Sequence, residues 1–262
     1  MDRRSTAESL VRAMLSLGDA ALRVSYVASV VRRWDVETLS ATLDVVCQRA
    51  EQAEPAWREA LVAIVDALND PDIEPIVQRM REQAAGESLL ALERLIRSPP
   101  GPTHAGTQGG RPRGNVLGDA RGRPLTLGER KSLARRPDRD TMQRLLADPH
   151  PDVVRGVLRN ARMTEDDVIR LAAKRPGRGE LLAEIARSIR WGHRPRVRIA
   201  LVMNPATPIE IAARIAGLLL RPELGLVAGS PGVSPGVRAL CLEHLERRPP
   251  FAKAGRRGEG VH

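Results

Sequence analysis

The residues best suited to binding chemistry lie in one basic segment, "RSIRWGHRPRVR", between Arg187 and Arg198. It holds five arginines, a tryptophan and a histidine within twelve residues. Guanidinium groups bind carboxylates and phosphates through paired hydrogen bonds, and they stack on aromatic rings. The segment therefore predicts a candidate interaction surface, whose members are Arg187, Arg190, Trp191, Arg194 and Arg196.

The same segment also has a structural interpretation. Arg187, Arg190 and Arg194 share one helical stripe, but Gly192 and Pro195 predict that the helix ends there. The tryptophan would then fill the corner between two helices, and the last arginine of the segment would bond to a neighbouring helix. The sequence leaves both interpretations open.

Nothing in the sequence predicts catalysis. It has no Gly-rich phosphate loop, no G-x-S-x-G and no H-E-x-x-H motif, and its five histidines are scattered. The carboxylates between Thr164 and Asp167 are of the kind that the dipole favours in the first turn of a helix. Cys47 and Cys241 stand alone, without a CxxC motif, so we expect buried free thiols. We therefore expect no enzyme, and no catalytic, cofactor or metal site.

The composition favours an all-α fold. Apolar residues make up 42% of the 262 residues and are mostly Ala, Leu, Val and Ile, with only five aromatic residues. Small aliphatic side chains suit closely packed helices better than a sheet sandwich filled with rings. Residues 1–97 also show helical periodicity, with helix-start signals at Asp35 and Pro55 and a capping-box spacing from Ser5 to Glu8. They predict a helical bundle or a short helical array.

Charge and composition divide the chain into parts. Residues 1–100 hold 12 arginines and 16 acidic residues, a net charge of −4, and the remainder carries +14. Arginine supplies 39 of the 42 basic residues, which indicates codon bias and weakens basicity as evidence for an acidic partner. A segment with 12 Gly or Pro among 27 residues lies between the parts and cannot form a core. The predicted parts are an acidic helical domain (1–97), a flexible linker (98–124), a basic helical part (125–248) and a disordered basic tail (249–262).

A proline, a short gap and a Val-Arg pair recur three times in the basic part. The pairs stand at 154–155, 197–198 and 237–238, which are 43 and 40 residues apart. A period near 40 with two helices per unit is typical of helical solenoids. The sequence therefore predicts stacked helical repeats.

A second pattern joins one helix to the next, and its clearest copy is "MNPATP". We expect Asn204 to end a helix in a left-handed conformation. Thr207 should then cap the following helix and Pro208 should be its first residue.

With these motifs, the segment from about Leu127 to Arg248 resembles the HEAT-like helical repeats of bacteria, especially the leucine-rich repeat variant kind. "LADPHPDVVRGVLRN" is similar to their pattern of Asp, Pro, Val-Arg and an apolar run, and "MNPATP" to their joint. The resemblance implies a C-terminal α-solenoid of degenerate repeats. It also implies structural roles for Asp148 and Arg155, because such residues commonly bond between units in that family. The cysteine-rich iron–sulfur region of some relatives has no counterpart in this sequence, so no cofactor follows.

Two kinds of binding remain open. One is a non-enzymatic scaffold or adaptor that binds a protein partner through the solenoid surface. The other is sequence-independent binding of duplex nucleic acid by the basic part, because five aromatic residues are too few for single-strand stacking. No uncharged apolar run approaches the roughly 20 residues of a membrane span, and no signal peptide is recognisable. We therefore expect a cytoplasmic protein, and the sequence indicates no oligomeric state.

Overall fold

The computed structural model describes residues 2–98, 117–118, 122–148 and 150–248. Every regular element within these residues is a helix, and the β-bridge from Gly118 to Pro124 is isolated. The all-α prediction is therefore confirmed for the described residues. The tail predicted at 249–262 lies outside them, as does most of the linker predicted at 98–124.

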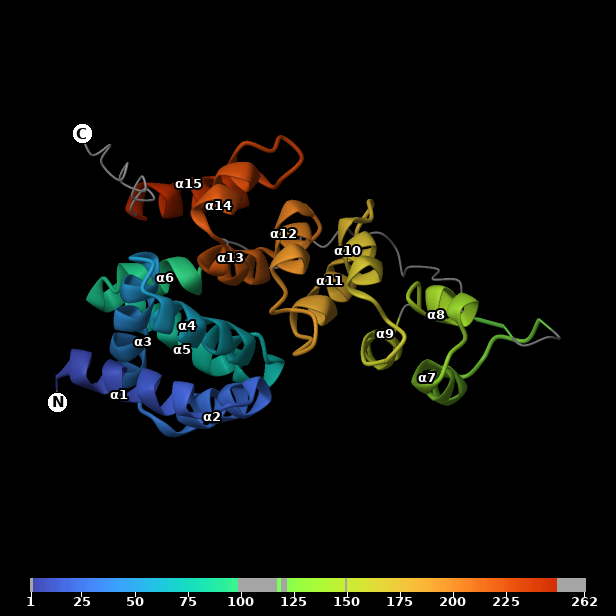
Figure 1. Ribbon diagram of the computed structural model, residues 1–262, viewed down its shortest axis with the longest axis horizontal. Helices are drawn as coiled ribbons and strands as arrows, with labels where there is room; N and C mark the ends of the chain where they lie inside the picture. Colours follow the sequence, from blue (N-terminus) through green and yellow to red (C-terminus); the bar gives the residue numbers. More distant parts are fainter. Residues whose placement is uncertain (1, 99–116, 119–121, 149, 249–262) are drawn as a thin grey trace, which may run out of the picture.

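The first part of the chain forms a bundle of helices around one apolar core (Figure 1, blue to green). Asp2, Asp19 and Asp35 each begin a helix by accepting a hydrogen bond from a backbone amide in its first turn, as predicted for Asp35. Pro55 is the first residue of the fourth helix, also as predicted. The bundle consists of α1 (Arg3–Ser16), α2 (Ala20–Arg33), α3 (Val36–Glu51), α4 (Pro55–Leu68), the 3-10 helix η1 (Pro71–Ile73), α5 (Glu74–Glu87) and α6 (Leu90–Leu95).

The capping box predicted from Ser5 and Glu8 is wrong. Helix α1 begins at Arg3, because the Asp2 side chain accepts a hydrogen bond from the Arg4 amide at 3.2 Å. Ser5 therefore lies inside the helix. Glu8 pairs instead with the Arg4 guanidinium, one turn away, at 3.2 Å.

The second part of the chain forms an array of helices that extends sideways from the bundle, with α7 and α8 at its far end (Figure 1, green to red). Helices contact the next but one along the chain: α7 packs on α9 and α9 on α11, while α10 packs on α12 and α12 on α14. The array therefore has two rows of alternating helices. It consists of α7 (Leu127–Arg135), α8 (Arg139–Leu145), α9 (Pro151–Leu158), α10 (Glu165–Ala173), α11 (Gly179–Ala186), α12 (Pro195–Met203), α13 (Ile209–Leu218), α14 (Arg221–Ala228) and α15 (Pro235–Arg247).

The three Val-Arg patterns each open a helix, since Pro151, Pro195 and Pro235 are the first residues of α9, α12 and α15. The prediction of two helices per period of about 40 residues is wrong, because three helices fill each interval. As a result, α9 and α12 lie in different rows. Helices of one row begin closer together, at residues 127, 151 and 179 for α7, α9 and α11 and at 165, 195 and 221 for α10, α12 and α14. The structural period is therefore 24 to 30 residues.

The joint between α12 and α13 also differs from its prediction. Asn204 is extended (φ −89°, ψ 118°), and its side-chain amide donates to the Ala172 carbonyl of α10 at 2.7 Å. The Thr207 hydroxyl donates backward to the Leu201 carbonyl at 2.6 Å, so it closes α12 and does not cap α13. Pro208 precedes the first residue of α13. The joint thus fastens the end of α12 to α10.

The bundle and the array share an interface built around α13, which packs against α4 and α6. Leu218 of α13 belongs to the apolar core of the bundle. The Arg214 side chain is 3% exposed, donates to the Leu68 carbonyl at 2.6 Å and pairs with Glu74 at 3.1 Å. The helical parts predicted at residues 1–97 and 125–248 are therefore in direct contact.

Candidate functional site

The predicted interaction surface lies at the corner between α11 and α12, where its side chains bind other parts of the protein. Trp191 is 2% exposed, and its indole NH donates to the Leu158 carbonyl at 2.7 Å. The guanidinium carbon of Arg190 lies 4.4 Å from the centre of this ring. Arg190 also donates to the carbonyls of Asn160 at 2.6 Å and Met163 at 3.1 Å. Both side chains therefore hold the joint between α9 and α10.

The other arginines of this surface are also engaged. Arg194 pairs with Glu165 at 3.1 Å, and Arg196 pairs with Asp166 at 3.1 Å. Both acids lie in the first turn of α10. Arg187 reaches the bundle, where it donates to a backbone carbonyl at 3.0 Å. The structure thus brings the five predicted residues to one corner, where they join helices to one another.

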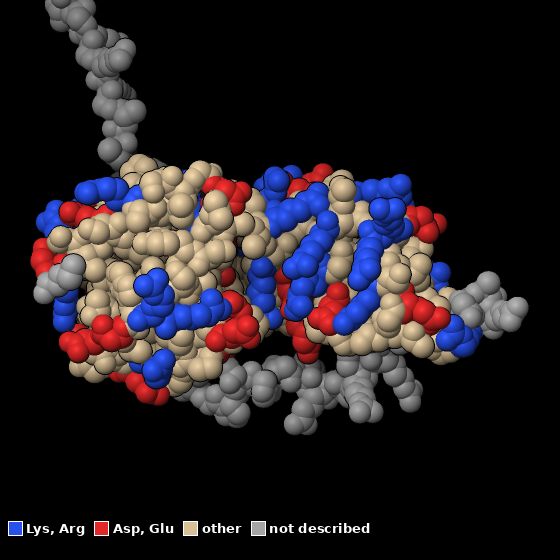
Figure 2. All heavy atoms as spheres, turned by 90° about the horizontal axis from the view of Figure 1, so that it is seen from below, with Lys and Arg blue, Asp and Glu red and all other residues tan. Residues whose placement is uncertain are grey.

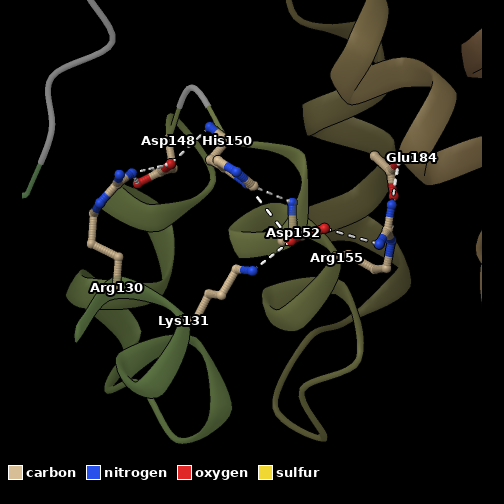
Figure 3. A network of polar contacts seen from close by, with 7 residues as sticks. All are labelled: Arg130, Lys131, Asp148, His150, Asp152, Arg155 and Glu184. Carbon is tan, nitrogen blue, oxygen red and sulfur yellow. Dashed lines mark hydrogen bonds and ion pairs between the residues drawn. The ribbon is translucent and has the colours of Figure 1, made fainter. Parts of the chain in front are cut away.

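A polar network joins α7, the joint between α8 and α9, α9 and α11 (Figure 3). The buried Asp148 carboxylate accepts hydrogen bonds from Arg130 of α7 and, at 2.8 Å, from the His150 amide. Arg155 of α9 donates to Glu184 of α11 through hydrogen bonds of 2.8 and 3.0 Å. Asp148 and Arg155 therefore both bond between helices, as the repeat resemblance implies, although each has its own partner.

The candidate site is a groove between α8 and α10, which we call the α8–α10 groove. Its volume is about 600 Å³, and α11 contributes to its lining. The apolar part of the lining comes from all three helices and one helix end: Met142 of α8, Leu146 directly after α8, Leu171 of α10 and Leu181 of α11. The groove exists because α8 and α10 stand apart while α7, α9 and α11 pack in succession beside them.

Two arginines bridge the groove at the two ends of α8. Arg139, at the start of α8, pairs with Asp167 in the first turn of α10 at 2.5 Å. Arg178, just before α11, donates to the carbonyl of Ala147 at 3.1 Å and to that of Asp148 at 2.8 Å. Because polar bonds fix the spacing of its walls, the groove is preformed.

The rim of the groove is basic. Arg170 and Lys174 lie on it one helical turn apart, and Lys174 has no ion-pair partner among the described residues. The acid in the described lining, Asp167, already pairs with Arg139 and Arg170. Burial raises the pKa of Asp167, but hydrogen bonds from Thr164 and Arg139 outweigh it and lower that pKa to about 2. Asp167 is therefore ionised and neutralised by its partners, which leaves Lys174 as an unpaired positive charge.

The groove lining that the structure describes holds no His, Cys, Ser, Thr or Tyr side chain. In the part of the chain that the structure describes, no group of three or more His, Cys, Asp or Glu residues could hold a metal ion. Cys47 in the bundle and Cys241 in α15 are buried free thiols, as predicted, and burial raises the pKa of both. Neither thiol lines the groove.

The sequence analysis did not predict this groove, because its lining combines three helices that no local pattern connects. One signal was present. Basic residues recur every fourth position at Arg170, Lys174 and Arg178, and Leu171 directly follows the first of them. All three line the groove, Arg170 on α10, Lys174 directly after it and Arg178 directly before α11.

No known protein-family model matches this chain, and no curated protein or solved structure matches it either. None of the helices in the described residues is long and apolar enough to cross a membrane. The geometry and charge of the α8–α10 groove therefore carry the functional argument.

Proposed function

We propose that the protein is a non-enzymatic binding scaffold whose array, a short α-solenoid of HEAT-like repeats, holds a segment of a partner protein in the α8–α10 groove. The groove carries the proposal, because it combines a volume of about 600 Å³ with an apolar lining and a basic rim. Binding pockets typically combine mostly apolar walls with a few polar groups that set the orientation of the ligand. Stacked helical repeats commonly present such extended surfaces to partners.

The partner segment that fits this groove is apolar on one side and acidic on the other. The side chains of Met142, Leu146 and Leu171 offer an apolar wall, and Arg170 and Lys174 offer positive charge along one edge. An amphipathic helix that lays its apolar face in a groove is a common mode of peptide recognition. Acidic residues on its other flank would then lie beside the α10 rim.

Blocking the groove tests the proposal. Peptides would be selected from a random phage-displayed library against the intact protein, and their affinities measured by fluorescence anisotropy. Ala147 lines the groove and is exposed, so Ala147→Trp should fill it and abolish binding of the selected peptides. Ala173→Trp is the matched control, because Ala173 is exposed on α10 and lies outside the lining.

A charge reversal tests the partner's chemistry. Lys174→Glu should weaken the selected peptides, whereas Arg144→Glu, an exposed site on α8 outside the lining, should not. Selection of peptides without acidic residues, or equal binding by the tryptophan variants at Ala147 and Ala173, would contradict the proposal.

Binding of duplex nucleic acid is the second candidate, and the uneven surface charge favours it. On the face seen in Figure 2, Lys and Arg side chains are concentrated over the half of the molecule that holds the array. Arg136, Arg159 and Arg162 are exposed and form no ion pair within the described residues. Two of these positions also have a structural explanation. The helix dipole favours positive charge at a C-terminus, and Arg136 and Arg159 directly follow α7 and α9.

Salt dependence separates the two candidates. Backbone binding to random duplex DNA should weaken linearly in log salt, with a slope of roughly −0.9 per phosphate contact. The triple change Arg136→Glu, Arg159→Glu and Arg162→Glu should flatten that slope, while Ala147→Trp should leave it unchanged. Peptide binding in an apolar groove should depend on salt much less.

A further inference from the structure

A second, smaller cavity lies at the interface between the bundle and the array. Its volume is about 180 Å³. Arg58, Leu61 and Val62 of α4 form one side, Arg198 of α12 another, and the last turn of α13 the third. Two arginines from different parts of the chain therefore line one small space.

Arg198 is unusually placed for a charged side chain. It is 7% exposed, and its Nε donates to the Gly192 carbonyl at 3.1 Å. Its two terminal nitrogens have neither a hydrogen-bond acceptor nor a carboxylate within ion-pair distance among the described residues. Because Arg198 lines the cavity, these donors are available to a molecule inside it.

Arg58 and Arg248, which lie nearby, also lack carboxylate partners in the described part of the chain. Arg58 donates to the Leu218 carbonyl at 3.0 Å, and Arg248 donates to the Gly217 carbonyl at 2.6 Å. Burial lowers the pKa of both Arg58 and Arg248. Other buried arginines of the same interface form ion pairs: Arg94 pairs with Glu51, and Arg214 pairs with Glu74. The cavity thus collects positive charge, and none of Arg58, Arg198 and Arg248 forms an ion pair among the described residues.

The acids around the cavity are occupied elsewhere or remain at a distance. Glu59, which lines the cavity, pairs with Arg23 of α2. Glu223 accepts a hydrogen bond from the Leu220 amide at 2.5 Å, at the start of α14. Asp66 of α4 interacts with Arg198 only at long range, without an ion pair. Burying an unpaired charge is costly, so a counter-ion would stabilise this arrangement.

We propose that the cavity between Arg58 and Arg198 binds a free tetrahedral oxyanion, inorganic phosphate or sulfate. The terminal nitrogens of Arg198 donate to it from α12, and Arg58 donates from α4. Arginine presents several donors in one plane, which suits phosphate and sulfate oxygens. The bound anion would link the bundle to the array, and this inference does not depend on the proposed function.

Anion binding to the full-length protein tests the inference. Thermal unfolding and calorimetric titration would be run with inorganic phosphate and with sulfate, against chloride at equal ionic strength. We expect a saturable rise in Tm with both oxyanions and not with chloride, since a ligand that binds only the folded state stabilises it. The absence of a saturable effect on the wild-type protein would overturn the inference.

Matched variants locate the site. Arg198→Gln should weaken oxyanion binding roughly tenfold or more, and Arg58→Gln should weaken it similarly, because each removes charge-assisted donors. Arg196→Gln, on the exposed side of the same helix, should bind as the wild type does. Equal loss in the Arg196 and Arg198 variants would show a general salt effect and overturn the site.

Two further measurements keep the test decisive. If Arg198→Gln does not fold, broadening of the phosphorus resonance of inorganic phosphate by wild-type protein, but not by Arg58→Gln, would support the site. Phenyl phosphate should bind more weakly than phosphate, because about 180 Å³ leaves little room for a ring beside the phosphate. Equal affinity for phenyl phosphate would overturn the assignment to a free ion.

Discussion

The guanidinium carbon of Arg190 lies 4.4 Å from the centre of the Trp191 ring, and both side chains donate to carbonyls at the end of α9 and in the joint that follows it. A guanidinium that stacks on an indole while its nitrogens donate to main-chain oxygens stabilises the fold. The contacts of Arg190 and Trp191 therefore fit the structural interpretation of this segment, in which it joins helices. The array uses arginine to satisfy carbonyls left open at the ends of its helices.

Trp191→Phe should lower the free energy of unfolding by roughly 1–3 kcal/mol, because it leaves the Leu158 carbonyl without its donor in a buried place. Urea unfolding followed by circular dichroism would measure the change. Trp34→Phe is the control, since Trp34 is only partly buried and its ring NH has no hydrogen bond within the described residues. Equal losses for the two variants would contradict the role given to the indole NH.

Thr207 provides a test of the corrected joint. Thr207→Ser should cost little, whereas Thr207→Val should cost about 1–2 kcal/mol, because the Leu201 carbonyl loses its donor. Thr207→Asp should destabilise more, since a carboxylate would face that carbonyl. At a helix N-cap, aspartate would instead serve as well as threonine. Thermal unfolding of the three variants would separate the two roles, and an Asp variant as stable as the wild type would restore the capping role.

Much of the local structure could be predicted, because short-range physics determines it. Thr164 and Asp167 form a capping box at the start of α10, where the sequence predicts the first turn of a helix, and Pro151 begins a helix where its ring is compatible with the first turn. The side chains involved lie within four residues of the groups they bind. Such contacts form wherever the segment becomes helical, so the sequence alone is informative about them.

The longer-range features were less accessible. The Thr207 hydroxyl could cap α13, which follows it, or donate to a carbonyl of α12, which precedes it. In the structure it donates to the Leu201 carbonyl of α12. The α8–α10 groove depends on how far Arg139 and Arg178 hold α8 from its neighbours, which involves partners about 30 residues away. The Val-Arg period of 43 and 40 residues was misleading because similar helix starts occur in both rows of the array.

The contact between bundle and array should persist when the chain is cut between them. With a specific protease site inserted between Thr107 and Gln108, the two cleaved pieces should elute together in size-exclusion chromatography. Arg214→Met should lower the denaturant concentration at which they separate, because a buried carbonyl and Glu74 lose their partner, at a cost of at least about 1 kcal/mol. Arg247→Met, at an exposed site on α15, is the control. Pieces that separate without denaturant would show that the interface is weak.

Asp66 should make the protein less stable as the pH rises. Burial raises the pKa of Asp66 from 3.8 to about 6, although Arg198 partly opposes the shift. The folded state therefore binds the proton more tightly than the unfolded state does. The stabilisation that comes from protonated Asp66 is complete below about pH 4 and is lost as the pH rises to about 6. The free energy of unfolding should fall by up to about 3 kcal/mol over this range, at 1.36 kcal/mol per pH unit.

Asp66→Asn removes this ionisation, so the variant should gain stability over the wild type at about pH 8, by up to about 3 kcal/mol, and match it near pH 4. Urea unfolding at a series of pH values would measure both curves. Asp140→Asn, an exposed site on α8, should leave the difference between the two pH values unchanged. If Asp66→Asn were instead less stable at the higher pH, the Asp66 carboxylate would be a stabilising partner of Arg198, because attraction to the guanidinium would outweigh the cost of burial.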